Sequence, residues 1–235
     1  ALSSAASDVY KRQMQKKKIS NGTLAAIIVL AIIIADQVIK IWVKTSFRLG
    51  ESMPFTNWAE LYFIENPGMA FGIELGGKLF LSIFRILASV ALVYFLFKIR
   101  KNEAYPKSFV VCLSMVTAGA IGNVIDGMFY GLIFSESTWY SVATLFPEGG
   151  GYGTFLHGLV VDMFHFPLVQ GTWPDWMPWV GGTDFEFFRP VFNLADAAIS
   201  VGIVWLILFN SKYLSFSGIE KSEAGQHDGD QDAKQ

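Results

Sequence analysis

The chain has 235 residues, of which 52% are hydrophobic and only 16% are charged, and its mean hydropathy is +0.41. This composition is typical of a membrane protein rather than of a soluble domain. The formal net charge of −2 gives no electrostatic case for nucleic-acid binding, and the single cysteine, Cys112, excludes an intrachain disulfide framework and a two-cysteine metal site.

The first residues do not look like part of the fold. Residues 1–13, "ALSSAASDVYKRQ", contain neither an initiator methionine nor the hydrophobic region of a signal peptide. We interpret them as a non-native or disordered leader. The remaining chain, residues 14–213, is predicted to form a single membrane domain.

Four apolar windows follow in chain order. A bilayer core of about 30 Å requires roughly 20 mostly apolar helical residues. Windows at about 24–43, 78–98, 108–131 and 190–211 meet this requirement. The predicted fold class is therefore an all-α membrane protein built as a four-transmembrane-helix bundle.

Positive charge predicts the orientation of these helices, because short loops rich in Lys and Arg remain cytoplasmic. Basic residues precede the first window and separate the second from the third: Lys11, Arg12, Lys16, Lys17, Lys18, Lys98, Arg100, Lys101 and Lys107. Both termini are predicted to be cytoplasmic, with residues 214–235 as a disordered polar tail. Residues 132–188 then form an enlarged outer loop, too long for a turn, whose "QGTWPDWMPWVGG" is rich in the Trp residues found at membrane interfaces.

Ionisable residues inside the windows are costly in a membrane, so they tend to face the bundle interior and to mark function. Asp36, Asp126 and Asp196 lie five to seven residues from the predicted outer ends of their windows. At 1.5 Å per residue, this places them roughly 8 to 10 Å below the outer surface. Arg85 reaches a similar depth. Carboxylates from three helices are thus predicted to converge on one layer.

Helical spacing adds polar partners to this layer. Residues three or four apart share a helix face, and three such pairs occur: Asp36 with Lys40, Asn123 with Asp126, and Asn193 with Asp196. Mutual neutralisation, a structural role, is favoured for the first pair. For Asp126 an orienting role and a catalytic role both stay open, and Arg85 could simply pair with one of the carboxylates.

A fourth acidic residue, Asp162, stands in "VVDMFHFP" (160–167), on the outer connection just before the last window. Alone it would be unremarkable, but it could close over the polar layer and meet Asp196. Two carboxylates in one site share a single proton. The ionised carboxylate can then deprotonate water while the protonated one polarises a peptide carbonyl. This is aspartic-protease chemistry, which requires no metal and no cofactor, and neither HExxH nor GxSxG is present.

Two other functions fit the same residues. Intramembrane aspartates also form proton relays, so a small proton-coupled transporter is the main alternative. That alternative predicts carboxylates spread through the bilayer and, ideally, inverted repeats, neither of which is evident. A non-catalytic assembly factor, in which the polar cluster only fixes helix packing, is the second alternative.

Five motifs occur in order: "ADQVIK" (35–40), "ENPGMAFGI" (65–73), "GAIGNVID" (119–126), "VVDM" (160–163) and "FNLADAAIS" (192–200). On these motifs the chain, from about residue 20 to 212, resembles lipoprotein signal peptidase, the type II signal peptidase of bacteria. The resemblance implies an integral aspartic endopeptidase. Such an enzyme cleaves the signal peptide of a prolipoprotein on the N-terminal side of the diacylglyceryl-modified cysteine.

The resemblance also implies roles for individual residues. Asp162 and Asp196 would be the catalytic dyad. The residues that would shape the site or bind substrate are Asn66, Gly68, Asn123, Asp126 and Asn193, with Asp36 and Lys40 in a first-helix motif of structural role.

Further implications concern the surroundings of the site. A small extracytoplasmic β-rich cradle would contain "ENPGMAFGI", and "AELYFIENPGMAFGI" is a strand, turn and strand pattern. The implied partners are diacylglyceryl-prolipoprotein, membrane lipids and the cyclic peptide inhibitor globomycin. The implied setting is the bacterial inner (cytoplasmic) membrane, with a monomer whose active site lies near the outer leaflet.

The chain departs from the family pattern in two places. Gly127 stands where an arginine usually follows the third-window aspartate, and we hypothesise that Arg85 supplies the missing charge. Residues 132–159 and 166–188 are additional to compact relatives, and they are predicted to form an outer lid or interfacial platform over the cleft.

Overall fold

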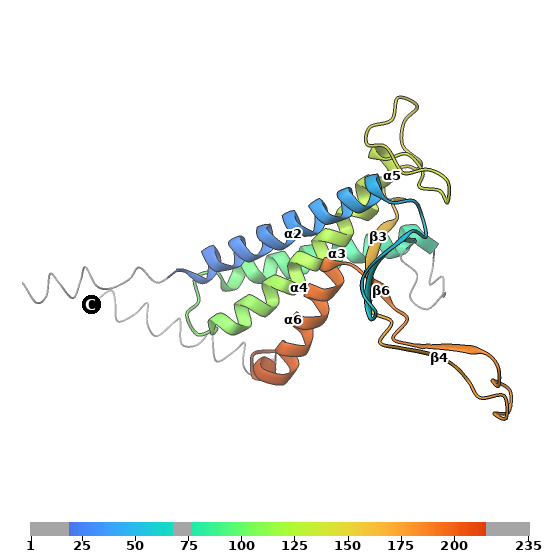
Figure 1. Cartoon of the computed structure of the whole chain (residues 1–235). Coiled ribbons are helices and arrows are strands. Elements are labelled where there is room, and N and C mark those ends of the chain that lie inside the picture. Colours follow the sequence, from blue (N-terminus) through green and yellow to red (C-terminus); the bar gives the residue numbers. More distant parts are fainter. Residues whose placement is uncertain (1–18, 68–76, 215–235) are drawn as a thin grey trace, which may run out of the picture.

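The computed structural model describes residues 19–67 and 77–214. The predicted leader 1–13, Gly68 and residues 215–235 of the predicted tail lie outside the described residues. Within them, four helices are long and apolar enough to cross a membrane, which confirms the four predicted spans (Figure 1). They are α2 (Asn21–Ser46), α3 (Gly77–Ile99), α4 (Lys107–Ile125) and α6 (Leu194–Asn210).

The observed ends of these helices follow from local capping. Helix α2 begins three residues earlier than predicted, because the Oγ atom of Ser20 accepts a hydrogen bond from the backbone of Thr23. Helix α4 continues through the π-helix η1 (Asp126–Tyr130) into α5 (Gly131–Ile133). Helix α6 begins later than predicted, because the preceding residues form a strand and Asn193 caps the helix.

The all-α prediction is incomplete, because a β-sheet lies at one end of the helices (Figure 1). Its four antiparallel strands have the order β1-β2-β3-β6 and comprise Ser52–Thr56, Ala59–Asn66, Val160–His165 and Val191–Phe192. Along β2 the side chains of Ala59, Leu61 and Phe63 are buried while their neighbours are half-buried, as period-two alternation requires. The predicted strand in "AELYFIEN" is therefore confirmed; the turn and second strand fall on residues 68–73, outside the described residues.

Two features of the predicted outer loop 132–188 also differ from expectation. Asp162 lies inside strand β3 rather than on a loop. Strands β4 (Val169–Thr172) and β5 (Asp184–Phe187) form a separate two-stranded antiparallel hairpin. After the last span, a short 3-10 helix, η2 (Ser211–Tyr213), follows α6.

Helices α4 and α6 approach closely because glycines face the partner helix. A Cβ atom on Gly119 would lie 2.2 Å from the carbonyl oxygen of Ala195, and one on Gly202 would lie 2.9 Å from that of Cys112. Small residues at such positions permit tight backbone packing in membranes. This contact places the first turn of α6 directly beside the polar residues of α4.

Candidate active site

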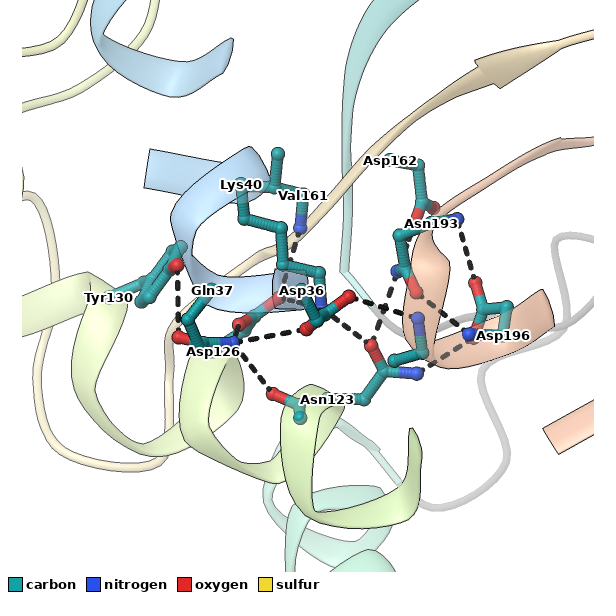
Figure 2. Close-up of polar contacts among 12 residues, drawn as sticks. Asp36, Gln37, Lys40, Asn123, Asp126, Tyr130, Val161, Asp162, Asn193 and Asp196 are labelled. Carbon is teal, nitrogen blue, oxygen red and sulfur yellow. Dashed lines mark hydrogen bonds and ion pairs between the residues drawn. The ribbon is translucent and has the colours of Figure 1, made fainter. Parts of the chain in front are cut away.

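Asp162 and Asp196 are joined through one side chain, Asn193 (Figure 2). The Nδ2 group of Asn193 donates to Asp162 at 2.7 Å, while its Oδ1 atom accepts from the backbone N–H of Asp196 at 2.9 Å. The Asp196 carboxylate returns a contact of 3.4 Å to the backbone N–H of Asn193, which completes a capping box. Helix capping therefore sets the position of one carboxylate relative to the other.

Asn123 connects this pair to the buried Lys40. The Oδ1 atom of Asn123 accepts from Lys40 at 2.9 Å and from Asn193 at 3.2 Å. Since the oxygen faces these donors, the Nδ2 group is directed at Asp196 and donates to it at 2.7 Å. The amide of Asn123 thus has a defined orientation and holds the Asp196 carboxylate.

Asp36 and Asp126 neutralise Lys40 and also hold backbone. Their carboxylates lie 2.9 and 2.7 Å from the Lys40 ammonium, so the predicted Asp36–Lys40 pairing is confirmed. Asp36 also accepts from the backbone N–H of Ala195 at 2.9 Å, and Asp126 lies 3.4 Å from that of Val161. Each carboxylate therefore contacts the backbone N–H of the residue immediately before one of the two candidate catalytic aspartates, Asp196 and Asp162.

Sequence reasoning missed Gln37 and Tyr130. The Nε2 group of Gln37 donates to Asp126 at 2.9 Å and to Asp36 at 3.2 Å, and its Oε1 atom accepts from the Tyr130 hydroxyl at 3.1 Å. The only signal in the sequence was the presence of a polar amide, Gln37, inside an apolar window. Gln37 supplies the donors that two buried carboxylates require.

A second buried ion pair anchors the end of β2, and the sequence did not predict it. Lys44 in the last turn of α2 pairs with Glu65 and donates to Ser137 at 2.8 Å. The next residue after Glu65 is Asn66, whose Nδ2 group donates to Asp162 at 3.2 Å. This ion pair thus fixes the strand end that presents Asn66 to the site.

The environment of Asp162 favours its protonated form. Burial raises the pKa of Asp162 to about 7, and the negative charge of Asp196 adds to the rise. Hydrogen bonds from Asn66 and Asn193 oppose this rise by stabilising the carboxylate. A carboxyl group with this pKa can hold or release a proton near neutral pH.

Arg85 of α3 is the predicted source of the positive charge that is absent at Gly127. The guanidinium of Arg85 is half-buried and interacts electrostatically with Asp196, Asp162 and Asp126. A Cβ atom on Gly127 would meet only Ser82 of α3, at 3.9 Å. Across residues 19–67 and 77–214, no group of three or more His, Cys, Asp or Glu side chains is arranged to hold a metal ion.

Comparison with known proteins agrees with this arrangement. The profile of the family Signal peptidase (SPase) II matches residues 28–211. The chain belongs to this family. A lipoprotein signal peptidase of Porphyromonas gingivalis is 51% identical over 191 residues, which cover 81% of this chain and 84% of the relative. A lipoprotein signal peptidase of Amoebophilus asiaticus is 35% identical over 187 residues, which cover 77% of this chain and 75% of the relative.

Solved structures support the same fold. A bacterial membrane enzyme solved at 2.3 Å resolution aligns with a TM-score of 0.54 and 25% identity, covering 81% of this chain and 89% of that chain. Another, solved at 1.9 Å resolution, gives a TM-score of 0.51 and 27% identity. The predictions of a signal peptidase II and of a multi-pass bacterial membrane peptidase are confirmed, and the transporter and assembly-factor alternatives lose their support.

Proposed function

We propose that this signal peptidase II removes signal peptides from prolipoproteins by cleaving on the N-terminal side of the diacylglyceryl-modified cysteine, with Asp162 and Asp196 as the catalytic dyad. The observation that carries this proposal is the Asn193 side chain, which contacts both aspartates in a buried polar layer. Family membership supports the substrate class.

The chemistry follows from one proton shared by the dyad. The raised pKa of Asp162 favours this carboxyl as the protonated member before reaction. The Asp196 carboxylate then takes a proton from water, and the hydroxide adds to the scissile carbonyl, whose oxygen is polarised by the proton on Asp162. When the carbon–nitrogen bond breaks, a dyad proton passes to the leaving amine of the cysteine.

The other polar residues have positioning roles in this proposal. Asn66 and Asn193 hold Asp162, and Asn123 holds Asp196. Asp36 and Asp126 hold the backbones of α6 and β3, the elements that carry the dyad. Lys40 neutralises both carboxylates. Gly68, for which the family resemblance suggests a contact with substrate backbone, lies outside the described residues.

The membrane setting of this proposal rests on charge and on depth. Basic residues flank the inner ends of the helices, so both termini are proposed to be cytoplasmic in the bacterial inner membrane. The dyad then lies near the outer leaflet, where the two acyl chains of a lipidated cysteine would hold the scissile bond. Exposed apolar side chains on α3 and α6 would contact membrane lipids and those chains.

The deciding experiment uses purified protein and a purified diacylglyceryl-prolipoprotein. Asp162→Asn and Asp196→Asn should each abolish cleavage, whereas Asp184→Asn, an exposed carboxylate on the hairpin, should leave it unchanged. Continued cleavage by both dyad variants would disprove the mechanism. Globomycin is expected to inhibit the wild-type protein. We also propose that the protein acts as a monomer.

Two further assignments belong to this proposal. Arg85 is proposed to replace the arginine absent at position 127, supported by its electrostatic interaction with the dyad; full activity of Arg85→Gln on lipidated substrate would reject it.

Residues 14–213 are proposed to form one membrane domain whose insertion 132–188 includes a lid over the cleft. An unchanged KM after residues 135–152 are trimmed would count against the lid.

A further inference from the structure

The β4–β5 hairpin occupies a defined place between the two aspartates. It leaves the end of β3, which carries Asp162, and returns to β6 just before Asp196. Figure 1 shows that it projects away from both the helices and the four-stranded sheet. Hydrogen bonding in the dyad does not require this extension, so the hairpin needs a separate explanation.

The tip of the hairpin is folded, yet it exposes its indole rings. The backbone of Gly182 donates to Trp173 and that of Gly181 donates to Met177, both at 2.9 Å. In contrast, Trp176 is 78% exposed and Trp179 is 100% exposed. Large apolar side chains held outward by an ordered backbone indicate an interaction surface.

Aromatic rings also pack at two places along the hairpin. The ring of Trp173 lies 4.6 Å from that of Phe185 on the hairpin. At the base, Phe192 lies 6.4 Å from Phe188 and 5.6 Å from Phe166, and α6 begins two residues after Phe192. The base of the hairpin therefore carries aromatic rings immediately before a helix that is long and apolar enough to cross a membrane.

The base of the hairpin is fixed to the sheet by one histidine. The two ring nitrogens of His165 lie 2.8 Å from Glu60 of β2 and 2.7 Å from Glu186 of β5. The hairpin is thus held at a set angle to the sheet that carries Asp162.

Charge narrows the choice of partner. Residues 168–188 contain three carboxylates, Asp175, Asp184 and Glu186, and no Lys or Arg. An acidic partner, an anionic lipid surface and nucleic acid are therefore disfavoured. Tryptophan is enriched at the boundary between lipid headgroups and acyl chains, where its ring meets apolar carbon and its N–H meets polar groups.

We propose that the tip of the β4–β5 hairpin lies in the outer leaflet, with Trp176 and Trp179 inserted at the headgroup–acyl boundary of zwitterionic phospholipid. The leaflet assignment rests on the orientation proposed above. The anchored hairpin sets the depth of Asp162 and Asp196 relative to the outer surface of the bilayer.

Spin labels test this insertion without any measurement of cleavage. The single cysteine is replaced (Cys112→Ser), and a nitroxide is attached to the full chain through Trp179→Cys or, as a matched control, Tyr140→Cys. Tyr140 is 91% exposed and lies on the other part of the insertion. Each protein is reconstituted in phosphatidylcholine vesicles, with and without phosphatidylglycerol, and collisions with oxygen and with a water-soluble nickel chelate are compared.

At position 179, oxygen collisions should exceed nickel collisions; at position 140, nickel collisions should dominate. Added phosphatidylglycerol or salt should not change either result, since the tip has no basic residue. Nickel access at 179 equal to that at 140 would overturn the insertion. So would spin–spin coupling between molecules with protection from both reagents, which would identify a second copy as the partner. Neither result depends on whether the dyad is catalytic.

Discussion

Substitution of Asp36 by Asn tests whether a residue outside the proposed dyad controls its geometry. The Asp36 carboxylate accepts from the backbone of Ala195 with one oxygen and pairs with Lys40 through the other. An asparagine amide can serve only one of these partners as an acceptor and turns an NH2 group toward the other. Because Lys40 keeps Asp126 at 2.7 Å, no buried charge is left unpaired. The expected loss is that of one charge-assisted hydrogen bond, about 1.5 to 3 kcal/mol.

The same substitution should reduce kcat more than it changes KM. A shift of about 1 Å in the first turn of α6 moves Asp196, and such misplacement can cost roughly 100-fold in rate; we expect a decrease of about 10- to 100-fold. Asp36 is 1% exposed, so substrate does not contact it directly.

The assay uses a feature of the chain itself. Cys112 is the only cysteine and is buried, so a maleimide dye reacts with it upon unfolding and reports stability in detergent. Glu51→Gln, which removes an exposed carboxylate paired with Arg48, should behave as wild type in both assays. Wild-type kcat in Asp36→Asn would refute the idea that Asp36 positions the dyad.

Three other predictions use the same thiol assay. The pKa of Asp162 rises from 3.8 to about 7 on folding, so the folded protein binds the proton more tightly than the unfolded chain. The free energy of unfolding should therefore fall as the pH increases from about 4 to 7. Asp162→Asn should remove this pH dependence. Gly119→Ala should destabilise by about 1 to 3 kcal/mol through overpacking against α6, whereas Gly149→Ala, which meets nothing within 4 Å, should have no effect. Lys44→Met should cost about 3 kcal/mol by leaving Glu65 buried and unpaired, and adding Glu65→Leu should restore part of that loss.

The local sequence was sufficient for the four spans and for the common layer of three of their carboxylates. Apolar length predicted four helices, and helical rise placed Asp36, Asp126 and Asp196 in one layer. The polar contacts among these helices agree with that layer. These inferences succeed because a bilayer forces each span to be long and apolar, so that a charged residue within it stands out.

The tertiary structure decided which backbone groups each carboxylate holds and how the long connections between the helices fold. The contact between Asp36 and Ala195 joins residues 159 positions apart, and no local pattern encodes such a pairing. Asp162 was assigned to a loop because strand β3 is buried along almost its whole length, so its sequence lacks the apolar–polar alternation that marks a half-buried strand. Helix propensity and hydropathy act between near neighbours along the chain, whereas this site is built from side chains that meet only after the helices and the sheet have packed.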